Sequence, residues 1–152
     1  MKKFMTALLI VTLLLSDCEN TWLKSKTITC TLDKGDEGNI VTIFKYHDDE
    51  IDKEVTTDKM RVEMKDFYPM IEMLNSAYGS YGNVNGIGFK VSYDEKEYTV
   101  TVKNVVNFRK IDFDELEKMK NGENRNLKEV FLNNRVLSER LLNLEDGGYT
   151  CK

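Results

Sequence analysis

The sequence predicts an α+β fold, in which an antiparallel sheet of about five strands, a meander plus a hairpin, is packed on one face by two or three helices. Three observations support this prediction. Segments with alternating side chains follow one another directly, which is typical of antiparallel strands. Segments with a 3.6-residue apolar period are grouped apart from them. The chain has 152 residues, which leaves enough for one domain once an N-terminal leader is removed.

The N-terminus has the layout of a bacterial export signal. Two lysines precede an uncharged apolar run over residues 4–15. This run has 12 residues, fewer than the roughly 20 that a membrane-spanning helix needs. We therefore expect residues 1–17 to form a cleaved signal peptide, residues 18–25 a tether and residues 26–152 a single α+β domain.

Cys18 closes this leader and is the expected lipidation site. Leu15 and Ser16 fit the pattern that precedes a lipidated cysteine. Asp17 departs from it, because lipoprotein signal peptidase prefers Gly, Ala or Ser at that position. Acylation of Cys18 would anchor the protein to the cell membrane on its extracytoplasmic face, since two or more acyl chains attach a protein stably. A secreted chain without lipid and an uncleaved N-terminal anchor are the alternatives.

The charge balance argues against two classes of partner. The chain has 22 Lys and Arg against 26 Asp and Glu, which gives a net charge of −4. An acidic surface of mixed charge predicts no nucleic-acid partner. It also predicts no polybasic patch for anionic lipid headgroups. No motif indicates a cofactor, so we expect none.

The meander is predicted in the first half of the domain. Residues 26–33 alternate and are rich in β-branched side chains, so we expect them to form the first strand. Turn-forming residues at 34–38 separate it from a second strand over 39–47. An acidic turn then leads to a third strand over 51–64.

The first helix is predicted over residues 67–78. Asp66 is its expected cap, and Pro69 lies in its first turn, where a missing N–H costs little. Apolar side chains recur along it with the period of a helix; they are Phe67, Met70, Ile71, Leu74, Ala77 and Tyr78. The glycine-rich stretch 78–88 follows as a loop.

A hairpin and two helices complete the predicted domain. Residues 89–94 and 98–106 alternate on either side of a polar turn, as the strands of a hairpin do. A D-x-x-E capping box opens a short helix over 112–120. A single longer helix is predicted over 127–145, with leucines along one side and two glycines after its end. Residues 149–151 then return as a short extended segment.

Cys30 and Cys151 are the cysteines that remain if Cys18 carries lipid. Export to an oxidising compartment permits a disulfide between them, which would close nearly the whole domain. Two free thiols are the alternative. We expect no metal site, because the chain has one histidine, His47, and it stands far from both cysteines in the sequence.

No constellation of residues predicts a catalytic or ligand site. The acidic stretch 48–52 lacks the ligand spacing and the glycine of a calcium loop, so a solvated turn accounts for it better. The glycines of 79–88 lie between a helix and a strand, which favours a flexible connection over a phosphate-binding loop. Tyr78 and Tyr81 are candidates for an exposed binding edge.

The other candidates have ordinary structural explanations. Every Asp and Glu lies in a polar run, so none stands out as one of a catalytic pair. His47 lies beside a turn among carboxylates and is expected at the surface. One helical stripe is assigned to the core, although Met-rich faces can also be adaptable binding surfaces; it consists of Met70, Ile71, Met73 and Leu74.

Three features resemble the YehR-type lipoproteins, a family of small bacterial lipoproteins without an assigned biochemical function. They are the leader that ends in Asp17-Cys18, the two strands around a polar turn in 40–57, and the tail of 111–118 with its closing helix and Gly-Gly-Tyr-Thr-Cys. Gram-positive members often have cysteines at the positions of Cys30 and Cys151. The resemblance implies an antiparallel sheet packed by helices, and it offers no catalytic residues.

These observations together predict a membrane-anchored, non-enzymatic binding or accessory module of the bacterial cell envelope, with an envelope protein or peptide as its partner. An enzyme that acts on envelope material through unrecognised carboxylates is one alternative, and a structural or immunity-type lipoprotein is another. Two carboxylates in one deep apolar pocket would favour the enzyme. An apolar patch rimmed by polar groups would favour the binding module.

Overall fold

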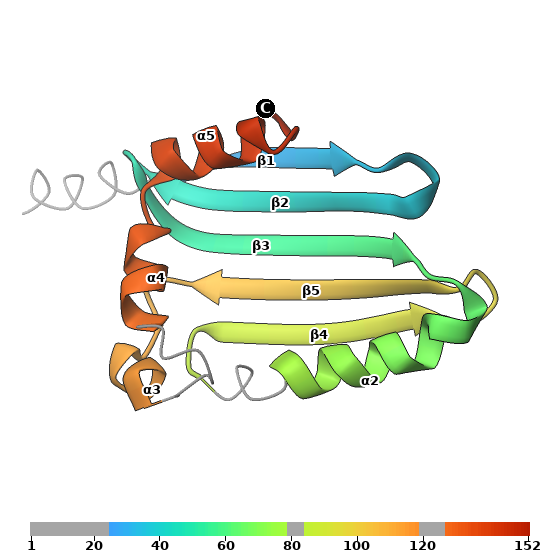
Figure 1. Ribbon diagram of the computed structural model, residues 1–152. Coiled ribbons are helices and arrows are strands. Elements are labelled where there is room, and N and C mark those ends of the chain that lie inside the picture. Colours follow the sequence, from blue (N-terminus) through green and yellow to red (C-terminus); the bar gives the residue numbers. More distant parts are fainter. Residues whose placement is uncertain (1–24, 79–83, 119–126) are drawn as a thin grey trace, which may run out of the picture.

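A six-stranded antiparallel sheet with helices on one face forms the domain (Figure 1). The computed structural model describes residues 25–78, 84–118 and 127–152, so the predicted signal peptide and Cys18 lie outside the described residues. The strand order is β4-β5-β3-β2-β1-β6, and every neighbouring pair is antiparallel. The strands are β1 (Lys26–Asp33), β2 (Gly38–His47), β3 (Glu50–Arg61), β4 (Ile87–Asp94), β5 (Thr99–Asn107) and β6 (Thr150–Cys151).

The predicted α+β class is confirmed, and the sheet has one strand more than the five expected. The extra strand is β6, which is the short extended segment predicted at 149–151. Its two residues pair with Cys30 and Thr31 at the outer edge of β1. The meander of β1 to β3 and the β4–β5 hairpin lie where the alternation predicts them, although β3 ends at Arg61 rather than at residue 64.

The α-helices of the described residues lie on the same side of the sheet. Figure 1 shows α5 over the β1–β2 side, α2 beside β4, and the short α3 and α4 at one end. The bounds of the helices are α2 (Phe67–Tyr78), α3 (Phe113–Lys118), α4 (Leu127–Asn133) and α5 (Leu137–Asp146). Asp66 ends a short 3-10 turn that runs into α2, and Asp112 caps α3 by accepting hydrogen bonds from the N–H groups of Asp114 and Glu115, both at 3.0 Å.

The prediction of one helix over 127–145 is wrong, because the chain breaks between α4 and α5. Backbone groups at the break bond to the β2–β3 turn instead of continuing a helix. The N–H of Ile51 donates to the carbonyl of Arg135 at 2.9 Å, and the N–H of Leu137 donates to the carbonyl of Asp49 at 2.9 Å. Val136 also forms an isolated bridge with Glu50. The hairpin therefore sets the place where the helix ends.

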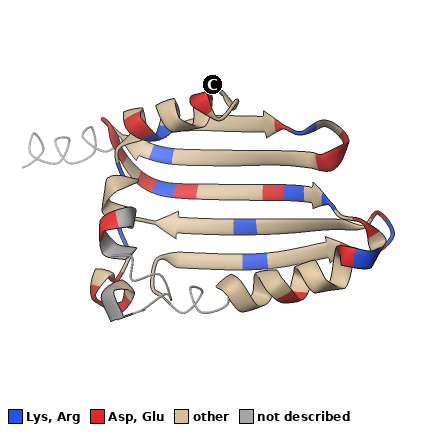
Figure 2. Ribbon diagram, in the orientation of Figure 1, with Lys and Arg blue, Asp and Glu red and all other residues tan. Residues whose placement is uncertain are grey.

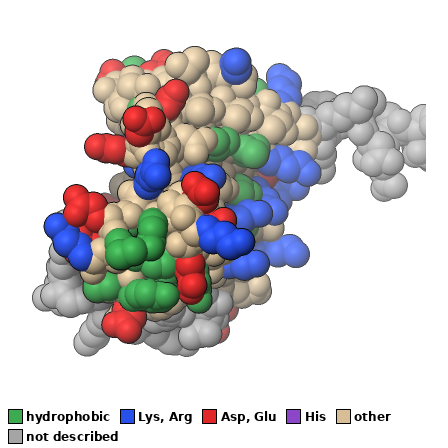
Figure 3. All heavy atoms as spheres, turned by 90° about the vertical axis from the view of Figure 1, so that its right-hand side faces the viewer, with side chains coloured by type: hydrophobic (Ala, Val, Ile, Leu, Met, Phe, Trp, Pro, Cys, Tyr) green, Lys and Arg blue, Asp and Glu red, His purple; other side chains and the backbone are tan. Residues whose placement is uncertain are grey.

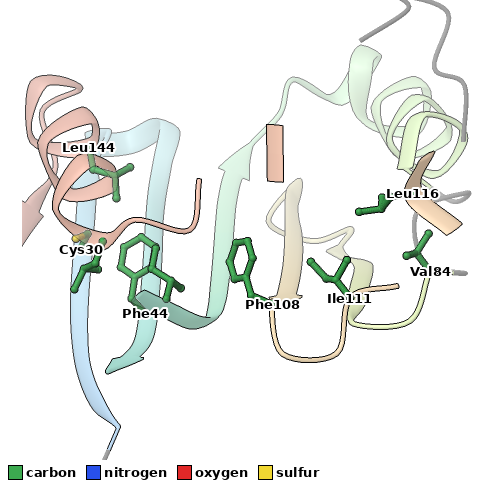
Figure 4. Close-up of a cluster of buried hydrophobic side chains, with 9 residues drawn as sticks. Cys30, Phe44, Val84, Phe108, Ile111, Leu116 and Leu144 are labelled. Atoms are coloured by element: carbon green, nitrogen blue, oxygen red, sulfur yellow. The ribbon is translucent and has the colours of Figure 1, made fainter. Parts of the chain in front are cut away.

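Two clusters of buried side chains hold the helices on the sheet. The larger one joins the first strands to α3 and α5, as Figure 4 shows; its members include Cys30, Phe44, Ile51, Leu116, Leu137 and Leu144. The second lies under α2 and consists of Phe67, Leu74, Val100 and Val102. Met73, which the sequence assigns to the core, is 56% exposed, because α2 turns this part of its stripe to solvent.

Alternation along the strands gives the sheet two distinct faces. Thr42, Phe44 and Glu54 are buried on the face under the helices, which we call the covered face. The neighbouring positions Lys45 and Val55 lie on the opposite side, which we call the open face. Since successive side chains of a strand point to opposite sides, this register assigns the strand residues away from the bulge at Lys45/Tyr46 to one face or the other.

The glycine-rich connection between α2 and β4 is packed in its described part. Val84 is only 4% exposed and belongs to the larger core cluster. Gly86 has a φ of +87°, and a Cβ on it would meet the backbone nitrogen of Ile111 at 2.6 Å. The prediction of a flexible connection is therefore wrong for residues 84–88, because the backbone here lies directly against the segment after β5.

Cys30 and Cys151 form a disulfide, which is the pairing that the sequence analysis expects. The two residues lie directly opposite each other in the β1–β6 ladder. Backbone hydrogen bonds continue this pairing between Thr29 and Lys152, in both directions at 2.9 Å. The bridge and the ladder together attach the C-terminus to the first strand of the sheet.

Candidate functional site

A cleft of about 410 Å³ lies on the covered face, and it is the best candidate for a functional site. Its floor is formed by β3, β4 and β5, and its sides come from the end of α2, from α4 and from α5. Aromatic and aliphatic side chains form most of its apolar lining, namely Tyr78, Ile87, Phe89, Val106 and Phe131. Its polar lining consists of Glu54, Thr56, Asn104 and Arg140.

Tyr78 provides one edge of this cleft. It is the last residue of α2, and its ring stacks on Phe89 with a centroid distance of 4.9 Å and an interplanar angle of 24°. Its side chain is 43% exposed, so it can contact both the cleft and solvent. The sequence singles out Tyr78 as an exposed aromatic candidate, and the structure places it at the cleft. Tyr81, the other candidate, lies outside the described residues.

Glu54 places a charge at the floor of the cleft, although it is only 7% exposed. Arg140 of α5 donates a hydrogen bond to its Oε1 at 2.9 Å, and the Thr56 hydroxyl donates to the same oxygen at 3.4 Å. Thr42 and Thr56 share a further hydrogen bond at 3.1 Å. These contacts fix Glu54 and Arg140 relative to the sheet, so the negative and the positive side chain of the cleft are both held in place.

The sequence analysis missed Glu54. It treats every carboxylate as part of a polar run, and the run around Glu54 does alternate between acid and base. The face that Glu54 shares with Thr56 and Asp58 is nonetheless the covered one. One feature could have indicated that Glu54 is buried. Phe44 alternates with the exposed Lys45 and so belongs to the core, and Glu54 lies directly opposite Phe44 on the neighbouring strand.

Asp58 and Tyr149 continue the polar side chains of the covered face from Glu54 and Thr56 toward β6. Lys34 lies 3.6 Å from the Asp58 carboxylate and balances part of its charge. Burial raises the pKa of the Tyr149 hydroxyl above its ordinary value of 10.0, and the charge of Asp58 raises it further. Tyr149 therefore stays neutral at physiological pH and acts as a packed aromatic side chain.

The acidic stretch 48–52 contains the hairpin turn that the sequence predicts, with Asp48 and Asp49 exposed, but its carboxylates also bond to other segments. Asp49 caps α5, since the N–H and the hydroxyl of Ser138 donate to its two carboxylate oxygens at 2.8 Å and 2.7 Å. Glu50 forms an ion pair with Arg135 at 2.6 Å. The carboxylates of this turn therefore hold the start of α5 and the residues just before it.

Asp52 and His47 form a second polar cluster at the end of the sheet where the β2–β3 turn lies. Asp52 is 4% exposed and accepts a hydrogen bond from Arg109 Nε at 2.6 Å. His47 Nδ1 lies 2.9 Å from the same carboxylate oxygen, so His47 is half-buried rather than at the surface. These contacts tie the segment after β5 to the β2–β3 hairpin, and Asp52 does not line the cleft.

The described part of the chain holds neither a metal-binding cluster nor a membrane-spanning helix. In residues 25–78, 84–118 and 127–152, no three His, Cys, Asp or Glu side chains are arranged to hold a metal ion. Over the same residues, no helix has the length and apolar character needed to cross a membrane.

Comparisons with known proteins agree on a family and a fold. The model of DUF1307, a family described as proteins of unknown function, matches residues 26–148. The solved structure of the E. coli YehR protein is similar to this chain with a TM-score of 0.61 and 14% identity, covering 84% of this chain and 91% of that one. A protein from Streptococcus pneumoniae TIGR4 is similar with a TM-score of 0.53 and 16% identity, covering 86% of each chain. No curated protein matches the sequence.

Proposed function

This chain belongs to DUF1307, a YehR-type family of unknown function, and on that premise we propose that it is a lipid-anchored, non-enzymatic binding module on the extracytoplasmic face of a bacterial membrane. In this proposal Cys18 carries the lipid. The cleft of the covered face binds an envelope peptide or a small amphipathic envelope component.

The cleft is the observation that carries the proposal. Its volume of about 410 Å³ falls in the range of sites that bind small ligands, roughly 300 to 1,000 Å³. Its apolar walls would take an apolar side chain or tail. Arg140 and Asn104 supply hydrogen-bond donors that would orient a polar group of the ligand. An apolar hollow with a few fixed polar groups is the usual form of a binding site.

The charges of the cleft favour binding over hydrolysis. Glycoside hydrolysis needs two carboxylates on opposite sides of the bond that is cut. Among the described lining residues Glu54 is the one carboxylate, and Arg140 and Thr56 already occupy it. Asp52 is held by Arg109 and His47 outside the cleft. The polar groups present are therefore suited to recognition.

The leader and the disulfide support the extracytoplasmic location. Residues 1–17 have the layout of an export signal, and Cys18 stands where a lipidated cysteine would be. A disulfide such as Cys30–Cys151 persists in an oxidising compartment and is rare in the reducing cytosol. Export accounts for both features at once.

Site-specific crosslinking in native envelopes tests the proposed cleft. A photoreactive phenylalanine derivative at position 78 replaces an aromatic side chain at the cleft. The control position is Tyr93, whose side chain is 53% exposed and does not line the cleft. We expect a discrete crosslinked product from position 78 and none of the same mass from position 93. The substitution Asn104→Trp fills the cleft and should remove at least nine-tenths of that product.

The matched control is Ser92→Trp, which puts an equally large side chain on the open face. It should leave the product unchanged. Equal products from positions 78 and 93, or a product that survives Asn104→Trp, would contradict ligand binding in the cleft. Turnover of an envelope polymer that stops in Glu54→Gln would instead support the enzymatic alternative.

A further inference from the structure

The open face of the sheet carries a group of five lysines that the cleft does not use. Lys45 lies on β2, Lys53 and Lys59 on β3, Lys90 on β4, and Lys103 on β5. Figure 2 shows that each of these four strands has basic positions. We call these five residues the lysine face.

The strand register brings the members of the lysine face together. Lys45 is directly opposite Lys53, and Lys90 is directly opposite Lys103. Side chains directly opposite on one face are about 5 Å apart at Cβ, and like charges at that distance repel. Two such pairs in one sheet weaken it when the protein is alone. An anionic partner would remove that cost.

The acidic residues near the lysine face gather at one end of it, where Asp33, Asp36 and Glu97 line one pocket together with Lys59. By alternation, Asp33 and Asp94 are the carboxylates that share the open face between the bulge at Lys45 and the far end of the sheet, and both lie at strand ends. No carboxylate of the described residues lies within ion-pair distance of the five lysines, whereas Lys34 and Lys65 each have one. Figure 3 shows basic side chains along its right-hand edge, away from most of the acidic ones.

The sequence analysis expects no polybasic patch on this acidic chain, and the arrangement of the five lysines argues against that expectation. The net charge of −4 is an average over the whole molecule. The carboxylates of Glu54 and Asp58 lie on the covered face and in ion pairs, so the lysines of β3 lie on the side opposite to them. Composition cannot show this separation, because it depends on which face the helices cover.

An apolar row lies between the two lysine pairs. Val105, Val55 and Ile43 are neighbours across β5, β3 and β2. Ile43 is 40% exposed, although it is a large apolar side chain. A surface of lysines around exposed aliphatic groups matches the boundary between lipid headgroups and acyl chains, where long cationic side chains reach the phosphates.

The length of the tether limits which anionic surfaces the domain can reach. Residues 18–25 can span at most about 29 Å when fully extended. The chain enters β1 beside Lys45, since Thr27 is directly opposite it. An anchor at Cys18 would therefore hold the lysine face within reach of the bilayer.

We propose that the lysine face docks on the anionic phospholipid headgroups of the membrane to which the chain is anchored. This proposal rests on the proposed anchoring for its orientation. The sheet then lies along the membrane surface, and the covered face with its cleft points away from the bilayer. Charge complementarity, the exposed Ile43 and the short tether all favour the membrane over a soluble partner.

Vesicle binding by the mature chain without its lipid tests the lysine face directly. The protein used is residues 18–152 with Cys18→Ser, so the result does not depend on acylation. It should bind vesicles of phosphatidylglycerol and phosphatidylcholine at least tenfold more tightly than vesicles of phosphatidylcholine alone. The binding should be lost at about 0.5 M salt, because the Debye length is then well below 10 Å.

Two matched triple variants separate the lysine face from net charge. Replacing Lys45, Lys90 and Lys103 by Gln should weaken binding to anionic vesicles at least tenfold. Replacing Lys34, Lys65 and Lys110 by Gln removes the same charge elsewhere and should weaken it less than threefold. Circular dichroism and an intact disulfide show that each variant is folded.

Three results would overturn the proposal. The first is equal binding to anionic and neutral vesicles, and the second is equal loss in the two triple variants. The third is tighter binding to a soluble poly(glycerol phosphate) than to vesicles at equal phosphate concentration, which would assign the face to a wall polymer. A chain that binds anionic vesicles but is not acylated in cells would support the lysine face and contradict the anchor.

Discussion

Glu54 links the core, the cleft and α5 through one buried carboxylate. It is 7% exposed, and its charge is balanced by Arg140, whose side chain is 28% exposed. Removing a carboxylate from water costs several kcal/mol, which only well-placed partners offset. Arg140 and Thr56 provide those partners, and Glu54 in turn keeps Arg140 at the cleft.

Arg140→Met therefore leaves a buried charge without its cation. We expect the free energy of unfolding to fall by about 3 kcal/mol, as measured by urea denaturation. The matched control is Arg135→Met, which breaks an ion pair with Glu50, a carboxylate that is 45% exposed. The control should cost less than about 1 kcal/mol, because exposed ion pairs contribute little. Equal losses in the two variants would contradict the structural role of Glu54.

The residues that sequence reasoning could predict are those whose partners are near in sequence or follow alternation. Phe44, Val100 and Val102 belong to predicted strands and are buried. Glu54 was not predictable in this way, because Arg140 lies 86 residues away and comes close only when the fold is complete. The same holds for Asp52 and Arg109, which are 57 residues apart.

Among the elements, local signals predict the boundaries of α2 and β1 and fail where tertiary contacts decide. A stripe of apolar residues and Pro69 are enough to predict α2. The leucine pattern continues across the break between α4 and α5, so it predicts one helix. The break follows from backbone bonds of Arg135 and Leu137 to the β2–β3 turn, which no local pattern shows.

The smallest element, β6, depends on the disulfide. Two residues of β-strand form too few hydrogen bonds to hold a chain end by themselves, and Cys151 attaches β6 to the fully buried Cys30. The bridge closes a loop with a sequence separation of 121 residues. In the loop-entropy model a loop of about this length stabilises a fold by about 4 to 5 kcal/mol.

Reduction should therefore lower the free energy of unfolding by about 4 kcal/mol. Urea unfolding of the protein with and without a thiol reductant measures this change. Cys151→Ser should show the same lower stability and should not respond to the reductant. A protein whose unfolding midpoint is the same with and without reductant would contradict a stabilising role of the bridge.

At the scale of the whole molecule, the sheet separates the two proposed binding surfaces. The covered face holds the cleft between α2, α4 and α5, and the open face presents the lysine face. The sequence predicted the fold class and the disulfide, because alternation and cysteine number report on them. It could not predict the cleft or the lysine face, because both depend on which side of the sheet the helices cover.

Both proposals place this domain at a membrane through Cys18, which is the central claim. Intact mass spectrometry of the protein isolated from its native membrane tests that claim most directly. We predict a chain that begins at Cys18 and carries two or three acyl chains on its N-terminal residue. A chain that begins at Met1, or an unmodified Cys18, would contradict it.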